Sequence, residues 1–185
     1  MAARNRLPPW HEMVRVADGR ELLIRPIRPD DAVPLRAGFD LMEPGALRQR
    51  FDPSLGEGSS DNALSEAAAE RLTHPDPRRE FAIVASEPLP AGEAVIGALA
   101  RVGVVDDMKR GEFAILVGRF LAGMGLGRHL MRRLVRWARG KQLEELYGDV
   151  AEDNQPMLAL AESLGFRRAD DAPSPGFVRV VLALK

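Results

Sequence analysis

The segment Ala122-Gly-Met-Gly-Leu-Gly-Arg128 decides how this chain is interpreted. It lies between a strand-like apolar run, Glu112 to Val117, and a helical pattern that continues to Arg139. Three alternating glycines leave backbone N–H groups uncovered at the start of that helix, where the helix dipole favours negative charge. Arg128 can add a charge-assisted contact. The segment predicts a loop that binds a phosphate or pyrophosphate. The alternative is a purely structural role, in which the glycines only let the helix pack closely on a sheet.

Two common phosphate-binding motifs do not fit this segment. A Walker loop needs Gly-Lys followed by Ser or Thr, and no such triplet occurs in the chain. A dinucleotide fingerprint needs Gly-x-Gly-x-x-Gly, but the frame from Gly123 has Arg128 at the sixth place and the frame from Gly125 has Leu130 there. A dinucleotide-dependent enzyme is therefore disfavoured.

Outward from the glycines, strands and helices are mixed along a chain of 185 residues, a length typical of one domain. We expect a flexible arm over 1–12, where Pro8 and Pro9 prevent regular structure, and a single domain over 13–185. The expected fold class is α/β, with a mixed sheet of the α+β kind. We expect this sheet to be central, twisted, mostly antiparallel and flanked by helices. One βαβ unit over 112–150 should carry the glycine loop. The expected strands are 13–17, 20–28, 80–86, 94–105, 112–117, 145–150 and 177–184, and the expected helices are 29–42, 44–51, 61–73 with a cap at Ser60 or Asp61, one from the loop to 139, and 154–164.

Composition excludes several classes of protein. The 26 basic and 27 acidic residues give a net charge of −1, which argues against a nucleic-acid binder with a generally basic surface. The chain has no cysteine, and its three histidines match no metal spacing, so we expect no metal site. No apolar run approaches the ~20 residues of a membrane helix, and no secretory signal is apparent. We therefore expect a cytoplasmic protein without a membrane partner.

A second segment completes a family resemblance. Asn154-x-x-Met157-Leu-x-Leu-Ala161-x-x-Leu164-Gly-Phe166 lies downstream of the glycine loop, and the two segments in this order resemble the GNAT superfamily of N-acetyltransferases. Leu23-Ile-Arg-Pro-Ile-Arg-Pro-Asp-Asp31, Leu47-Arg-Gln-Arg-Phe51, Leu72-Thr-His74 and Gly111-Glu-Phe-Ala-Ile-Leu-Val117 are similar to the catalytic domain of bacterial protein lysine acetyltransferases of the Pat type.

The resemblance implies that acetyl-CoA is the co-substrate. The pyrophosphate would lie on Gly123, Met124, Gly125, Leu126, Gly127 and Arg128, and the backbone of Ile115, Leu116 and Val117 would bond the pantetheine arm as an added strand does. A main-chain N–H near Leu116 or Val117 could hold the thioester oxygen. Asn154 would bond the arm from the other side, and it could also cap its own helix.

Glu112 is the candidate general base. Without cysteine an acyl-cysteine intermediate is impossible, so the amine must attack the thioester directly and must first lose a proton. Strand alternation places Glu112 on the face of Ala114 and Leu116, an apolar setting in which a carboxylate is a better base, and Pat-type enzymes use a Glu here. The alternative is a solvated Glu beside Lys109 and Arg110, and Glu80 is the reserve candidate.

The sequence departs from the family pattern at two positions. Ala122 replaces the usual Gln or Arg before the glycines, which should weaken binding modestly because backbone N–H groups make the main phosphate contacts. Ala161 stands where many members carry a Tyr that protonates the leaving thiolate, and the one tyrosine of the chain is Tyr147.

These observations predict an acetyl-CoA-dependent N-acetyltransferase that acts directly on a primary amine, with a protein lysine, such as one in an acyl-CoA synthetase, as the first choice of acceptor. A small-molecule amine acetyltransferase and a non-catalytic acyl-CoA-binding regulatory module are the alternatives. The segment 39–75 should distinguish the two acceptors, because the family builds the acceptor site there. Since dimers are common in the superfamily, the resemblance also suggests a homodimer.

Overall fold

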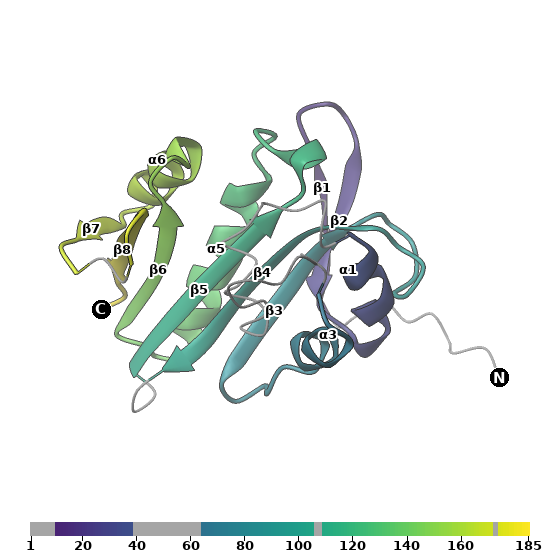
Figure 1. Ribbon diagram of the computed structural model, residues 1–185, viewed down its shortest axis with the longest axis horizontal. Helices are drawn as coiled ribbons and strands as arrows, with labels where there is room; N and C mark the ends of the chain where they lie inside the picture. The colour runs from purple at the N-terminus through teal and green to yellow at the C-terminus, as the bar shows by residue number, and fades with distance from the viewer. Residues whose placement is uncertain (1–9, 39–63, 106–108, 172–173) are drawn as a thin grey trace. The chain divides into compact units, whose positions relative to one another are not determined.

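The computed structural model describes residues 10–38, 64–105, 109–171 and 174–185 (Figure 1). Most of the expected arm, the expected helix 44–51 and most of the segment 39–75 lie outside these ranges. Residue Glu12, the last of the expected arm, already begins the first strand.

Within the described residues, eight strands form one mixed sheet in the hydrogen-bonded order β1-β2-β3-β4-β5-β6-β8-β7. The pairs β1–β2, β2–β3, β6–β8 and β7–β8 are antiparallel, whereas β5 and β6 are parallel, as expected for a βαβ unit. The strands are β1 Glu12–Arg15, β2 Glu21–Pro26, β3 Glu80–Ser86, β4 Ile96–Val105, β5 Arg110–Val117, β6 Glu145–Ala151, β7 Arg167–Ala169 and β8 Phe177–Ala183. The mixed α/β fold is therefore confirmed, and the expected strand ends are within one or two residues.

The helices show one wrong prediction. The helices in the described residues are α1 Ala32–Gly38, α3 Glu66–Thr73, α5 Leu126–Gly140 and α6 Gln155–Ser163, with short 3-10 turns η1 Pro29–Asp31 and η3 Arg119–Leu121. Helix α3 is capped by Ser65, whose extended backbone lets its hydroxyl accept a hydrogen bond from Ala68 N, and not by Ser60 or Asp61. The short strand β7 had no expected bounds, because its three residues, Arg-Arg-Ala, carry no alternation signal.

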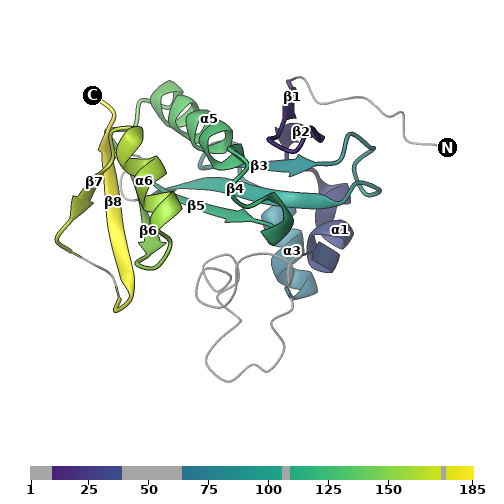
Figure 2. The ribbon, with the colours of Figure 1, turned by 90° about the horizontal axis from the view of Figure 1, so that it is seen from above.

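Two compact units make up the chain, and each is described by itself. Unit 1 comprises the chain up to Pro75, Ala82–Leu99 and Leu116–Met124, and unit 2 comprises Asp76–Phe81, Ala100–Ile115 and Gly125–Lys185. In unit 1, the tight turn at Asp18-Gly19 joins β1 to β2, with Gly19 at a φ of 90°. Helices α1 and α3 lie side by side (Figure 2).

A buried ion pair lies in unit 1. The guanidinium of Arg25 on β2 donates from Nη1 to Asp31 Oδ2 at 2.7 Å and from Nη2 to Asp31 Oδ1 at 2.8 Å. The side chains are 2% and 0% exposed. Asp31 Oδ2 also accepts from the backbone N–H of Arg28, so the pair fixes the turn that leads from β2 into α1.

In unit 2, a close apolar contact and a side-chain hydrogen bond join helices α5 and α6. A Cβ on Gly127 would lie 3.1 Å from a methyl of Leu160, and Arg128 Nη2 donates to Ser163 Oγ at 3.0 Å. On β6, alternate residues point to opposite faces, so Leu146, Gly148 and Val150 share one face and Tyr147 and Asp149 share the other.

Removing one partner of the buried pair should destabilise the protein strongly. We expect Asp31→Ala to lower the free energy of unfolding by about 3–5 kcal/mol, because it leaves a buried guanidinium without its carboxylate. The measurement is urea denaturation. The matched control is Arg168→Ala, which breaks the exposed pair with Glu162 and should cost less than about 1 kcal/mol. Equal losses in the two variants would contradict the expectation.

Candidate active site

The strands β5 and β6 stop pairing directly after Glu112. Their ladder joins Arg110 to Glu145, Gly111 to Leu146 and Glu112 to Tyr147, while β6 stays paired with β8 as far as Ala151. Figure 1 shows β5 and β6 running apart. Strand β5 thus carries backbone groups beyond Glu112, toward Val117, that are outside the ladder with β6, and such a strand edge can accept an extended arm.

Phe113 packs on β6 directly after the last ladder pair. Its ring covers Gly148 on β6 so closely that a Cβ on Gly148 would lie 2.5 Å from ring carbons. The ring of Phe166 meets it edge-on, with 5.5 Å between centroids, and both rings are nearly fully buried. The ring therefore lies on the face of β6 at Gly148, one residue beyond the last ladder pair.

The glycine loop after β5 presents an uncapped helix N-terminus. Gly123 and Gly125 have φ values of 75° and 83°, which favour glycine strongly, and no heavy atom lies within 4 Å of a Cβ built at either position. Gly125 is the N-cap of the 15-residue helix α5, and no side chain caps that end. The open space, the exposed N–H groups and the helix dipole together fit an anionic group such as a pyrophosphate.

The other predicted loop residues have distinct environments. Leu126 is buried, which anchors the start of α5, and Met124 is half-buried. Gly127 lies against Leu160, so at this glycine the absence of a side chain lets α5 pack closely on α6. Arg128 is bonded to Ser163 on α6.

On β5, Leu116 is fully buried, and Ile115 and Val117 are half-buried. Their side chains alternate between the two faces, as the strand geometry requires.

Asn154 is the N-cap of α6. Its Oδ1 accepts a hydrogen bond from Met157 N at 3.3 Å, which is the capping alternative of the sequence analysis. The cap uses only the side-chain oxygen, and the amide NH₂ of Asn154 makes no hydrogen bond to any described residue, so it can still donate to a ligand.

Glu112 lies beside a tyrosine that sequence reasoning did not connect with it. Glu112 is half-buried, and its ladder partner Tyr147 is 8% exposed, with both side chains on the same face. Burial raises the pKa of Tyr147, and the negative charge of Glu112 raises that pKa further. The two groups therefore interact electrostatically.

Two arginines cover this tyrosine. The guanidinium carbons of Arg110 and Arg179 lie 5.3 Å and 4.8 Å from the centroid of the Tyr147 ring. Arg179 is held by the buried Asp149, with Nε donating to Oδ1 at 2.9 Å and Nη2 to Oδ2 at 3.2 Å, and this hydrogen bonding raises the pKa of Arg179. The alternation Glu145, Tyr147, Asp149 was visible in the sequence, but the register that brings Arg179 opposite Asp149 was not.

Both carboxylate oxygens of the reserve candidate Glu80 make contacts within the fold. Its Oε2 accepts from Asp76 N at 2.9 Å and its Oε1 accepts from Arg101 Nη2 at 3.4 Å. Both oxygens of Glu80 therefore serve the turn before β3 and an ion pair across the sheet.

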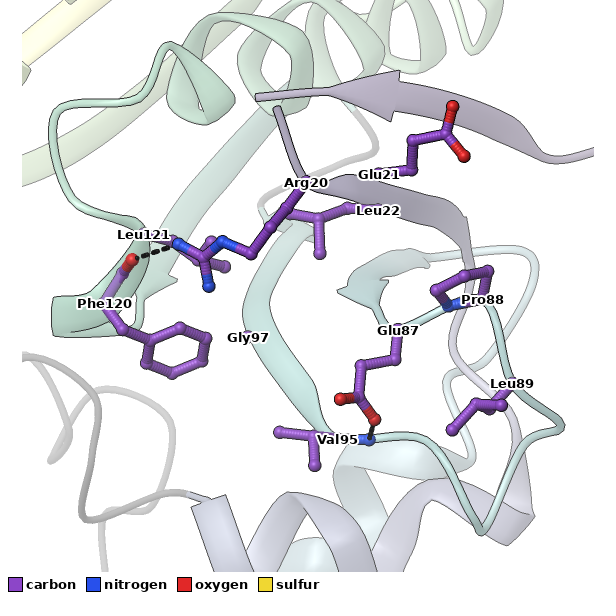
Figure 3. Close-up of a pocket in the computed structure, with 10 residues that line it drawn as sticks. All are labelled: Arg20, Glu21, Leu22, Glu87, Pro88, Leu89, Val95, Gly97, Phe120 and Leu121. Carbon is purple, nitrogen blue, oxygen red and sulfur yellow. Dashed lines mark hydrogen bonds between the residues drawn. The ribbon is translucent and has the colours of Figure 1, made fainter. Parts of the chain in front are cut away.

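Two of the surface hollows are lined entirely by described residues. In unit 2, one of about 670 Å³ is lined by arginines together with Tyr147, namely Arg110, Arg167, Arg168 and Arg179. In unit 1, one of about 370 Å³ is lined by Arg20, Phe120 and apolar residues of β4 and its preceding turn (Figure 3). Across the described ranges, no helix is long and apolar enough to cross a membrane, and no group of three His, Cys, Asp or Glu could hold a metal ion.

Comparison with known proteins gives consistent matches. The family model described as acetyltransferase (GNAT) domain matches residues 21–167. The chain is 29% identical over 165 residues to Acetyltransferase PA5475 of Pseudomonas aeruginosa, covering 88% of this chain and 85% of that protein.

Solved structures share the fold. The GNAT domain of S. lividans PAT superposes with a TM-score of 0.74 at 21% identity, over 97% of this chain and 100% of that one. The protein yncA from Salmonella typhimurium, solved with its cofactor acetyl-CoA, superposes with a TM-score of 0.62 at 17% identity, over 89% of this chain and 94% of that one.

The single tyrosine allows a direct test of the contact between Glu112 and Tyr147. We expect the tyrosinate absorbance of the folded protein to appear with a midpoint above the ordinary tyrosine pKa of 10.0, and Glu112→Gln to lower that midpoint by removing a negative charge. Since the folded-state pKa is raised, the stability linked to this group is present below the unfolded-state pKa and is lost as pH rises through the folded-state pKa. Identical midpoints in wild type and Glu112→Gln would show that the two groups do not interact.

Proposed function

The chain belongs to the GNAT acetyltransferase family, and from this premise we propose that it transfers an acetyl group from acetyl-CoA directly to the amine of a protein lysine. GNAT proteins are acetyl-CoA-dependent N-acetyltransferases, and that general activity follows from membership. The observation that supports direct transfer is the end of the β5–β6 ladder at Glu112, and the choice of a lysine acceptor rests on the resemblance of the segment Gly111–Val117 to the Pat type.

Acetyl-CoA would bind along β5. From Glu112 to Val117 the strand rises by about 16 Å, at ~3.3 Å per residue, which gives a long edge for the pantetheine arm. The backbone of Ile115, Leu116 and Val117 would bond this arm, and Asn154 would donate its free NH₂ group to it. The N–H groups at Gly123–Gly127 would hold the pyrophosphate. This position favours anions because no side chain caps the N-terminus of α5 and the helix dipole is positive there.

Glu112 would take the proton from the acceptor amine. The amine of lysine is almost fully protonated near neutral pH, and only its neutral form is a nucleophile. After this first deprotonation the nitrogen attacks the thioester carbon and the N–C bond forms. The C–S bond then breaks, and the nitrogen loses its second proton to solvent to give the amide. A main-chain N–H near Leu116 or Val117 would stabilise the negative charge that develops on the thioester oxygen.

The leaving thiolate needs no dedicated acid in this scheme. Ala161, at the family's tyrosine position, is fully buried in α6 and has no proton to give. A thiol has a pKa near ~8.5, so the thiolate is a moderate leaving group that can take its proton from water. The absence of a hydroxyl at position 161 is thus compatible with catalysis.

The first test concerns the glycine loop. We expect Gly125→Ala to raise the Kd for acetyl-CoA by about tenfold or more, because alanine resists the φ of 83° and the loop would lose the geometry that presents its N–H groups. Isothermal titration calorimetry is the measurement. The matched control is Gly140→Ala at the other end of α5, where a Cβ meets nothing within 4 Å and affinity should not change. Failure of the wild-type protein to bind acetyl-CoA would contradict the proposed function.

The second test concerns the base. We expect Glu112→Gln to lower kcat by about 10²–10⁴-fold while the Kd for acetyl-CoA stays within about twofold, because the amide cannot accept the proton. A panel of lysine peptides and small amines serves as acceptors, and Glu80→Gln is the matched control with kcat near wild type. Preference for small amines over every peptide would overturn the lysine assignment, and binding without turnover of any acceptor would favour an acyl-CoA-binding regulatory module.

A further inference from the structure

A contact from the β1–β2 hairpin reaches the segment that leads into the glycine loop. Arg20 directly follows the hairpin turn, and its Nη2 donates to the backbone carbonyl of Phe120 in η3 at 2.8 Å (Figure 3). The same nitrogen lies 3.6 Å from the sulfur of Met124, inside the loop. The guanidinium also lies over the Phe120 ring, 5.8 Å from its centroid. All three residues belong to unit 1.

The guanidinium is itself held in place. Asp18 accepts a hydrogen bond from Arg20 Nε at 2.6 Å through Oδ2 and one from Arg20 N at 3.1 Å through Oδ1. The backbone hydrogen bond from Arg20 is the largest cause that lowers the pKa of Asp18, so it favours the charged form of this carboxylate. The Asp18 carboxylate holds Nε of Arg20, and Nη2 of the same guanidinium donates to the Phe120 carbonyl.

The same segment is held on its other side by β4. Gly118 N donates to Gly97 O at 2.7 Å, and Leu121 N donates to Gly118 O at 2.9 Å. The side chain of Leu121 fills the space above Gly97, where a Cβ would clash with its methyl group. Residues 118–121 are therefore clamped between β4 and Arg20.

The glycines that follow lack such support. At Gly123 and Gly125, where φ is positive, no heavy atom lies within 4 Å of the position of a Cβ, so no side chain packs over either glycine at that position. Their conformation depends on the anchored residues before them and on the buried Leu126 after them. Ordering the loop in advance lowers the entropy that a ligand must supply on binding.

We propose that Arg20, oriented by Asp18, is a positioning residue that holds the glycine loop in its anion-binding conformation and thereby sets the affinity for acetyl-CoA. This inference rests on the proposed function. Arg20 acts through the Phe120 carbonyl and Met124, and so it should affect binding of the co-substrate and leave the chemical step alone.

The test compares variants on the same hairpin. We expect Arg20→Ala to raise the Kd and the KM for acetyl-CoA about tenfold, with kcat within about twofold of wild type, as expected for loss of one charge-assisted hydrogen bond. The control Arg15→Ala removes an exposed arginine that pairs with Glu21 at 3.3 Å, and it should change neither constant. Arg20→Lys keeps the charge but not the planar fork, so it should recover only part of the affinity.

A second readout needs no co-substrate. Hydrogen exchange of the free protein should become faster over residues 118–126 in Arg20→Ala and stay unchanged in Arg15→Ala. Unchanged exchange and unchanged Kd in Arg20→Ala would overturn the inference, as would full recovery in Arg20→Lys or a fall in kcat at constant KM. If wild-type protein binds no acetyl-CoA, the proposed function fails, while the exchange result still decides whether Arg20 anchors the loop.

Discussion

The position of Phe113 over Gly148 is the constraint on which the candidate site depends. Gly111, two residues earlier, packs so tightly on Val102 and Leu143 that a side chain there would clash, so the start of β5 is held firmly in the sheet. The ring of Phe113 packs on the face of β6 at Gly148, directly after the last ladder pair. Glu112 lies between these two contacts, as the last ladder residue on β5. The same packing that builds the core therefore also determines where the carboxylate and the unpaired strand edge meet.

The proposed binding site relies on backbone groups that no backbone partner in the described ranges pairs. Unpaired N–H groups are costly when buried, and they persist here at the exposed start of α5 and along the edge of β5. Neighbouring contacts compensate for the missing pairing. Gly97 and Arg20 hold the segment before the glycines, and Leu126 is buried after them.

Charged residues contribute to this structure through individual ion pairs, which the net charge of −1 does not reveal. The pair of Arg25 with Asp31 is fully buried and fixes the turn into α1, whereas the pair of Arg179 with Asp149 supports Tyr147 next to Glu112. A buried pair adds little net stability compared with apolar residues, but removing one partner is costly. Such pairs therefore specify which geometry is adopted more than they increase stability.

The sequence by itself determined the mixed α/β class, the strand ends to within two residues, the glycine loop and the candidate Glu112, because alternation, glycine spacing and turn residues are local signals. It missed the Ser65 cap and strand β7, where local signals were ambiguous or absent. Only the tertiary structure decided the contacts between distant residues, such as Arg20 with Phe120, Arg179 with Asp149 and Phe113 with Gly148. The physical reason is that register and packing depend on how separate elements fit together, and a single element does not encode which residue it will face.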